Sequence, residues 1–337
     1  MSTYRGLLKK EAYSNIINCL KENNYQCGVE YVVDLACSKN EITNLITFFI
    51  NYFNNHILNS YNCFIFHFAS KLERLDNMPR KKGIYENKIF QETVIDVYIL
   101  LCLRRPRDDK FDFIKNNVQS IKRDLGDFSF EYKESELINL AFGPDINLKM
   151  LEKMLALLYL LENGKHSLAI GLIYIYVTGN DSYNADDLDM TCFKYKKSIK
   201  NKGIAFYIWK LIYKYTFKTK PYLIQVVDDY YTVYNIGLNK KNSIERVNIL
   251  LHIAYLITTN KYMKTDTIDN KIKKLKESIN INAFDLVLQV DEPVLQQKEK
   301  VPKKTHDYLK CITFVRDDTK PDFSKNARSN MLKEVAF

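Results

Sequence analysis

Apolar residues recur at helical spacing along most of this chain. In residues 147–162, for example, Leu148, Leu151, Leu155 and Leu158 share one helix face. Asn163-Gly164 follows as a typical helix stop. The same spacing predicts helices at 9–24, 63–75, 87–104, 109–124, 189–200, 204–217, 221–236, 243–260 and 268–279. Residues 166–178 are apolar on nearly every side, which indicates a central core element, with a β-branched end that leaves a strand as the alternative.

Two segments between the predicted helices indicate a helix start and a boundary between subdomains. Ser38-Lys39-Asn40-Glu41 has the spacing of a capping box and predicts the start of a helix that buries Ile42 and Phe49. Residues 127–146 form a polar and aromatic connector that contains Gly143-Pro144. We therefore expect an N-terminal helical subdomain at 1–126 and a C-terminal helical subdomain at 147–279.

The pattern changes character after residue 280. Phe284 to Val290 alternates as a strand does, and Cys311 to Val315 is a second short β-like run. Residues 291–307 are charged and punctuated by proline. We expect an extended or partly disordered tail at 280–337. The predicted fold is all-α, a multi-helix bundle or irregular helical array, with a C-terminal extended arm that has room for a short β-hairpin.

Composition agrees with a helical protein that has a sizeable core. Hydrophobic residues make up 46% of the 337 residues, and only 10 Gly and 7 Pro interrupt them. No stretch of 18 apolar residues occurs, so no membrane span is expected. The seven cysteines form no C-x-x-C pair and lie mostly in apolar segments. They indicate reduced thiols in a reducing, intracellular compartment.

Familiar catalytic motifs are missing from the sequence. It contains no phosphate-binding G-x-x-x-x-G-K-[ST], no G-x-G-x-x-G, no G-x-S-x-G and no H-E-x-x-H. Asp186, Asp187 and Asp189 lack the spacing of an EF-hand and read better as a solvated helix N-terminus than as a metal site. Asp228 and Asp229 read as a polar helix face or a local ion pair. We expect a non-enzymatic protein without cofactor or metal; a nuclease built on dispersed acidic residues is the remaining enzymatic alternative.

The strongest candidate for chemistry is a lysine-rich and aromatic stretch. The net charge of +10 favours anionic partners. Tyr207, Trp209, Tyr213 and Tyr215 alternate here with lysines, so exposed rings would stack bases while the lysines contact phosphates. The candidate nucleic-acid-binding residues are Lys194, Lys196, Lys197, Lys200, Lys202, Lys210, Lys214, Lys218 and Lys220. In the competing interpretation, the rings face the core and the lysines are merely solvated.

A second basic group has a simpler interpretation. It consists of Arg80, Lys81, Lys82, Arg104, Arg105, Arg107 and Lys110. Arginine clusters suit phosphate, but basic residues also stabilise the C-terminal ends of helices through the macrodipole. Arg80 to Lys82 and Arg104 to Lys110 each lie at the end of a predicted helix, which favours the stabilisation of helix ends over phosphate binding.

Two stretches carry a family resemblance. Both resemble helical proteins of nucleocytoplasmic large DNA viruses. The first is Ala36-Cys37-Ser38 with the segment that continues to His56-Ile57, and the second is Lys196 to Lys200 followed by Gly203 and Phe206 to Trp209. The resemblance covers about a third of the chain and implies a host cytoplasm or virion context without a known activity. The leading hypothesis is a nucleic-acid-associated or assembly protein, DNA or RNA being equally open. The alternative is a scaffold or minor virion protein whose C-terminal arm binds a protein partner.

Overall fold

The structure, a computed structural model, is helical almost throughout its described part. That part comprises residues 2–58, 63–81, 83–103, 117–126, 136–143, 146–179, 188–195, 203–238, 244–259, 268–279 and 283–288. Within these ranges there is no strand, and one isolated antiparallel bridge joins Ser2 and Leu8. The predicted all-α fold is confirmed. In the same ranges, every helix is too short or too polar to cross a membrane.

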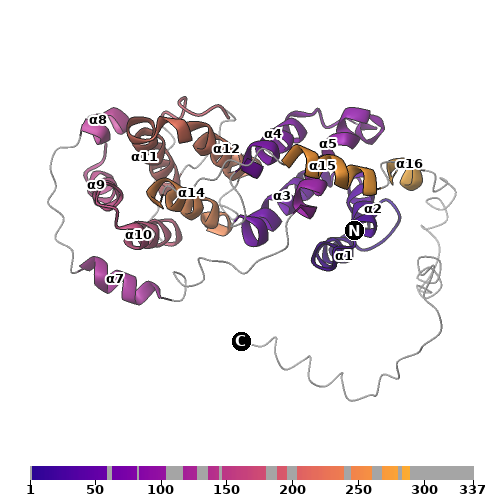
Figure 1. The fold of residues 1–337 in the computed structure, drawn as a ribbon, viewed down its shortest axis with the longest axis horizontal. Coiled ribbons are helices and arrows are strands. Elements are labelled where there is room, and N and C mark those ends of the chain that lie inside the picture. The colour runs from indigo at the N-terminus through magenta and orange to yellow at the C-terminus, as the bar shows by residue number, and fades with distance from the viewer. Residues whose placement is uncertain are drawn as a thin grey trace, which may run out of the picture. The chain divides into compact units, whose positions relative to one another are not determined.

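The N-terminal helices follow the predicted pattern with one addition (Figure 1). They are α1 (Lys9–Glu22), α2 (Tyr25–Cys37), α3 (Ile42–Tyr52), the π-helix η1 (Phe53–Ile57), α4 (Cys63–Asn77), the 3-10 turn η2 (Ile84–Glu86) and α5 (Lys88–Cys102). The addition is α2, which buries residues around most of its circumference and therefore shows no clear polar face to detect. Asn87 caps α5 by accepting from the Ile89 and Phe90 amides.

The remaining helices follow the described residues that end at 103. They are α7 (Val118–Gly126), α8 (Glu136–Phe142), α9 (Leu148–Glu162), α10 (His166–Thr178), α11 (Ile204–Thr219), the 3-10 turn η3 (Pro221–Leu223), α12 (Ile224–Asn235), α14 (Val247–Thr259), α15 (Ile268–Ser278) and α16 (Ala283–Leu288). Residues 166–178 are a helix, which removes the strand alternative. The predicted helices at 147–162, 204–217, 221–236, 243–260 and 268–279 are present within a few residues of their expected bounds.

Three local predictions are wrong. The connector at 127–146 contains a helix, α8. The expected helix at 189–200 is absent from residues 189–195, where Asp189 Oδ1 accepts from the Thr191 amide and forms a turn instead. The strand-like run that starts at Phe284 is helical through Leu288, because its apolar residues pack on α2. The second β-like run, Cys311 to Val315, lies outside the described residues.

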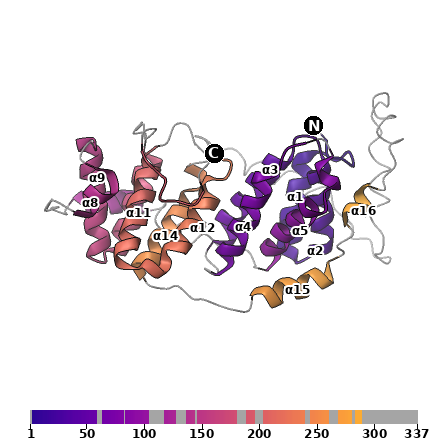
Figure 2. The ribbon, with the colours of Figure 1, turned by 90° about the horizontal axis from the view of Figure 1, so that it is seen from above.

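Helix packing joins distant parts of the sequence. Helix α4 packs against α12, and both ribbon views place them side by side (Figures 1 and 2). Helix α7 packs on α10, α15 on α5, and α16 on α2. One continuous hydrophobic cluster extends from Ala12 on α1 to Val287 on α16. Met1–Gln289 accordingly forms one compact unit, so 1–126 and 147–279 share a core, and their division into subdomains stays a prediction.

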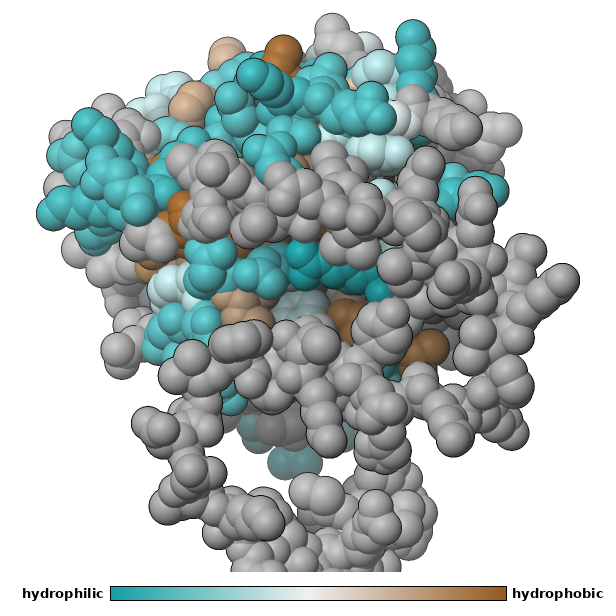
Figure 3. Space-filling model, turned by 90° about the vertical axis from the view of Figure 1, so that its right-hand side faces the viewer, coloured by the Kyte–Doolittle hydropathy of each residue, from teal (hydrophilic) through white to brown (hydrophobic). Residues whose placement is uncertain are grey.

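The end of this unit that carries α1, α2, α5 and α16 has a polar exterior. Its visible described residues are mostly hydrophilic, with only isolated hydrophobic side chains between them (Figure 3). Asp96 on α5 contributes to the attachment of α15, because its carboxylate pairs with Lys71 of α4, at 2.6 Å, and with Lys276 of α15. A buried carboxylate with two ammonium partners is far less costly than an unpaired one.

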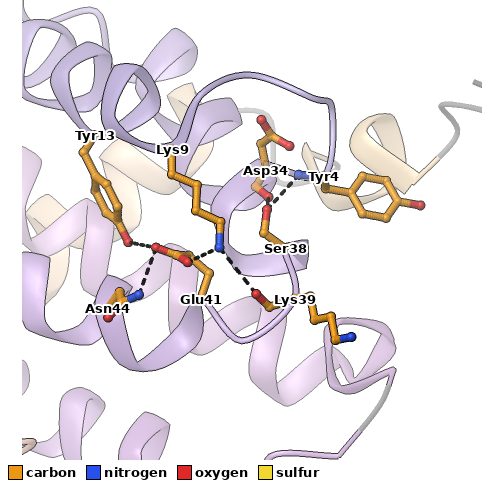
Figure 4. Close-up of polar contacts among 8 residues, drawn as sticks. All are labelled: Tyr4, Lys9, Tyr13, Asp34, Ser38, Lys39, Glu41 and Asn44. Carbon is orange, nitrogen blue, oxygen red and sulfur yellow. Dashed lines mark hydrogen bonds and ion pairs between the residues drawn. The ribbon is translucent and has the colours of Figure 1, made fainter. Parts of the chain in front are cut away.

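A buried polar cluster fixes the N-terminal segment to the α2–α3 junction (Figure 4). Glu41 is 2% exposed and accepts hydrogen bonds from Lys9, from the Tyr13 hydroxyl at 2.8 Å and from the Asn44 amide at 3.3 Å. Ser38 Oγ accepts from the Tyr4 amide at 2.7 Å. The expected capping box at Ser38 and Glu41 is therefore wrong in mechanism, since both side chains bind the N-terminal segment instead of helix amides.

Candidate nucleic-acid interface

Helix α11 carries the lysine-rich and aromatic pattern, and it is a core helix. It begins after Gly203 and ends at Thr219, with Lys220 as its C-cap before Pro221. Trp209 is fully buried, with its ring centroid 5.5 Å from those of both Tyr231 and Tyr234 on α12. Tyr215 is buried as well, and its hydroxyl donates to the Leu161 carbonyl at 3.3 Å.

These aromatic residues thus stabilise the core, as the competing interpretation proposed. Edge-to-face and tilted ring pairs of this kind add to the free energy gained from burial. The expectation that Trp209 and Tyr215 stack bases is wrong, because neither ring reaches the surface. Tyr207 and Tyr213 are half-buried.

Lys210 and Lys214 are both withdrawn from solvent, Lys210 almost fully and Lys214 in part. Lys210 is 7% exposed. Both lysines lie near the Cys192 thiol and lower its pKa, while Asp189 and Asp228 lie near the same thiol and raise it. Burial is the largest influence and raises the pKa of Cys192 to about 11. Because its side chain is buried, Lys210 is unsuited to contact a polyanion.

The remaining described lysines of the candidate site are separated from one another. The Lys194 amide donates to Asp228 Oδ1 at 3.4 Å, and its ammonium contacts Gln225. Lys218 Nζ lies 3.0 Å from Glu136 Oε2 on α8. Lys220 donates to the Ile257 carbonyl near the end of α14, and burial lowers the pKa of Lys220. Lys196, Lys197, Lys200 and Lys202 lie outside the described residues.

One basic and aromatic surface does remain, at the C-terminal end of α11. Phe217 is 62% exposed and Tyr222 is 66% exposed, five positions apart on either side of Pro221. Lys218 lies between them in sequence with 54% of its side chain exposed, and Lys214 lies one helical turn earlier, half-buried. We call Lys214, Phe217, Lys218 and Tyr222 the α11 end surface. The sequence pattern included its lysines and missed its rings, because helical spacing alone does not show which aromatic residues are exposed.

A second polar site lies where α4 packs against α12. Tyr195 donates to Asp76 Oδ2 of α4 at 3.0 Å, and Gln225 donates to Asp229 Oδ1 of α12 at 2.8 Å. Asp228 and Asp229 are both buried. Burial raises the pKa of Asp229 to about 7, with smaller contributions in the same direction from Asp228 and Glu73. The prediction that these acids form a simple polar helix face missed this burial.

Arg80 shows the structural role expected for the second basic group. Its guanidinium donates to the Leu75 carbonyl near the end of α4 at 3.1 Å and lies 3.7 Å from Asp76. An arginine that caps a helix C-terminus in this way stabilises the helix without any ligand. Lys81 follows on the exposed surface, whereas Lys82, Arg104, Arg105, Arg107 and Lys110 lie outside the described residues.

No group of three or more His, Cys, Asp or Glu side chains in the described ranges has the arrangement of a metal site. Asp189 is exposed and takes part in its local turn, whereas Asp186 and Asp187 lie outside the described residues. His252 is buried on α14, where its ring lies 5.5 Å from the Tyr230 ring. This agrees with a structural role for that histidine.

Two buried groups near α14 were missed by the sequence analysis. Arg246 is completely buried and donates from Nη1 to the Tyr234 and Ile236 carbonyls, both at 2.7 Å, at the end of α12. Asn54, in the π-helix η1, donates to the Glu245 carbonyl at 2.8 Å. Isolated Arg and Asn side chains carry no pattern that identifies such contacts in advance.

No family model matches this chain, and no curated protein or solved structure matches it significantly.

Proposed function

We propose that this chain is a non-enzymatic, nucleic-acid-associated protein that contacts its ligand through the α11 end surface. The observation that carries the proposal is the exposure of Phe217 and Tyr222 beside Lys218. Every base has a π-face, so exposed rings next to cations bind nucleic acid with little sequence preference. The net charge of +10 supports the encounter with a polyanion.

The pairing of Lys218 with Glu136 is compatible with this role. Both side chains are largely exposed, and exposed ion pairs contribute little to stability. A phosphate can therefore replace Glu136 at small cost. Lys210, by contrast, contributes to the fold and not to binding.

The test is binding of labelled oligo(dT) and oligo(U) by the full chain across a salt series. Phe217→Ala with Tyr222→Ala should weaken binding by about 10-fold or more, because each stacked base contributes about 1–3 kcal/mol. Lys218→Gln should lower the steepness of the salt dependence by about 0.7, the contribution of one phosphate contact on a single strand.

Matched controls lie on other helices. Phe66 on α4 is 53% exposed, so Phe66→Ala removes a comparable ring elsewhere. Lys273→Gln with Lys274→Gln removes two exposed charges from α15. If the Phe217 and Tyr222 variant binds like the wild type, or if only the α15 variant loses affinity, the α11 end surface is not the interface. An absence of binding at low salt would refute the proposed function itself.

A further inference from the structure

The α1–α2 hairpin brings two cysteines together. Asn23 adopts a left-handed conformation, with φ of 59°, and the Asn24 amide donates to the Cys19 carbonyl at 2.8 Å. This tight turn folds α2 back along α1. Cys19 and Cys27 lie four residues before and four residues after Asn23, so the turn places them opposite each other.

Gly28 shows how closely the helices approach at this level. A Cβ atom built on Gly28 would lie only 3.0 Å from Cys19 Cβ. Cys27 is the residue immediately before Gly28, so it lies at the same level of the hairpin. The Cys27 thiol lies close enough to Cys19 and to Tyr31 to raise the pKa of both groups, after the larger effect of burial.

The two thiols differ in access and in environment. Cys19 is buried, whereas Cys27 is half-buried, and neither takes part in a disulfide. Burial, followed by the charge and hydrogen bond of Cys27, raises the pKa of Cys19 to about 12. Cys27 is thus placed to react first with an oxidant, and Cys19 is placed to resolve the product.

We propose that Cys27 and Cys19 form a peroxide-reactive pair that closes to an intramolecular disulfide. The Cys27 thiolate attacks the terminal oxygen of a hydroperoxide; an S–O bond forms and the O–O bond breaks, which leaves a sulfenic acid on Cys27. The alkoxide, or hydroxide from hydrogen peroxide, leaves and takes up the proton that the Cys27 thiol released, as alcohol or water. The Cys19 sulfur then attacks the Cys27 sulfur; an S–S bond forms, and hydroxide leaves and takes up the Cys19 proton as water. Two thiols are oxidised and one peroxide is reduced.

The pair has properties that the other described cysteines lack. Cys37 and Cys102 are buried, as Cys19 is, and burial raises the pKa of both thiols, so neither is as open to an oxidant as half-buried Cys27. Cys192 is half-buried like Cys27, but it lies in the segment before α11, and no other described cysteine is placed to resolve it. Cys192 is therefore the matched control for accessibility without a resolving partner.

The test is treatment of the native full chain with hydrogen peroxide, followed by alkylation and peptide mapping. We expect the peptides that contain Cys19 and Cys27 to become linked with loss of two hydrogen atoms, reversibly by dithiothreitol. Cys27→Ser should abolish the link, and Cys192→Ser should leave it unchanged. Cys19→Ser should leave a sulfenic acid on Cys27 that dimedone traps.

Other results would overturn the assignment. A linkage between Cys27 and any other cysteine, a disulfide between two chains, or the absence of dimedone labelling at Cys27 in the Cys19→Ser variant would each exclude the pair. Circular dichroism of each variant before treatment establishes that the helices are intact. Because the readout is covalent, this result does not depend on whether the chain binds nucleic acid.

Discussion

Gly28 offers a sharp test of the packing among α1, α2 and α5. Helix propensity alone favours Gly28→Ala, because alanine in a helix interior is about 1 kcal/mol more favourable than glycine. The tertiary structure opposes this gain. A Cβ atom at this position would lie 2.9 Å from Tyr98 Cζ and 3.0 Å from Cys19 Cβ, and still closer to the Tyr98 hydroxyl oxygen.

The expected magnitude follows from these distances. Tyr98 is fully buried on α5, and its hydroxyl donates to the Tyr25 carbonyl at 3.2 Å, so the ring has little freedom to move away. Overpacking a dense core costs about 1–3 kcal/mol, and overlap with a fixed ring belongs at the upper end. After the gain in propensity of about 1 kcal/mol, we expect Gly28→Ala to lower the free energy of unfolding by about 2 kcal/mol.

Urea unfolding monitored by circular dichroism measures this difference. With an m-value of about 3 kcal/mol/M, the midpoint should fall by about 0.7 M. Gly126→Ala is the control, because nothing lies within 4 Å of a Cβ atom there. Tyr98→Phe should cost less in the Gly28→Ala background than in the wild type, since it removes the closest overlapping atom. If Gly28→Ala instead raises the midpoint, the helices are not packed as closely as the structure shows.

Two further predictions concern buried carboxylates. Glu41→Gln should lower the free energy of unfolding by about 3 kcal/mol, since it leaves the Lys9 ammonium without its carboxylate. In urea unfolding, adding Lys9→Met to the same chain should recover part of this loss. If the effects of the two substitutions are fully additive, the pair is not coupled. Asp229 binds its proton more tightly in the folded than in the unfolded chain, so stability should fall as the pH rises from about 4 to about 7. The change in the free energy of unfolding on Asp229→Asn should therefore be more favourable at pH 8 than at pH 4, by at most about 4 kcal/mol. Asp124→Asn, at an exposed position, is the control. Equal effects of Asp229→Asn at both pH values would refute the burial of this carboxyl.

Local signals in the sequence were sufficient for most of the helices. Leucines at helical spacing and the stop at Asn163-Gly164 predicted α9 almost to the residue, because both signals depend only on neighbours along the chain. Helix α2 was missed since it is buried on most sides. The run from Phe284 was read as a strand, although α2 and Phe90 provide apolar contacts for a helix there. Tertiary contacts decided both cases, and no pattern within either segment contains that information.

The candidate site shows the same limit more strongly. Spacing placed Lys210, Lys214 and Lys218 on one face of α11, but it could not show that Lys210 is buried or that Asp228 influences the same Cys192 thiol as Lys210 and Lys214. Asp228 follows Lys210 by 18 residues and belongs to the next long helix. The exposure of Phe217 and Tyr222 likewise depends on where α11 ends against α8 and α14, and not on their own sequence neighbours.

Burial of part of the lysine set makes the number of phosphate contacts a measurable quantity. If Lys214 and Lys218 alone contact a single strand, the logarithm of the binding constant should change with the logarithm of salt concentration by about −1.4, at about −0.7 per contact. All nine candidate lysines would give about −6.3 on the same basis. Lys210 and Lys220 are committed to internal contacts, so a value near −6.3 would require cations from outside the candidate set. The slope of the salt dependence could also lie between these limits and become less steep when Lys196, Lys197, Lys200 and Lys202 are neutralised. That result would extend the interface from the α11 end surface to the segment that precedes the helix.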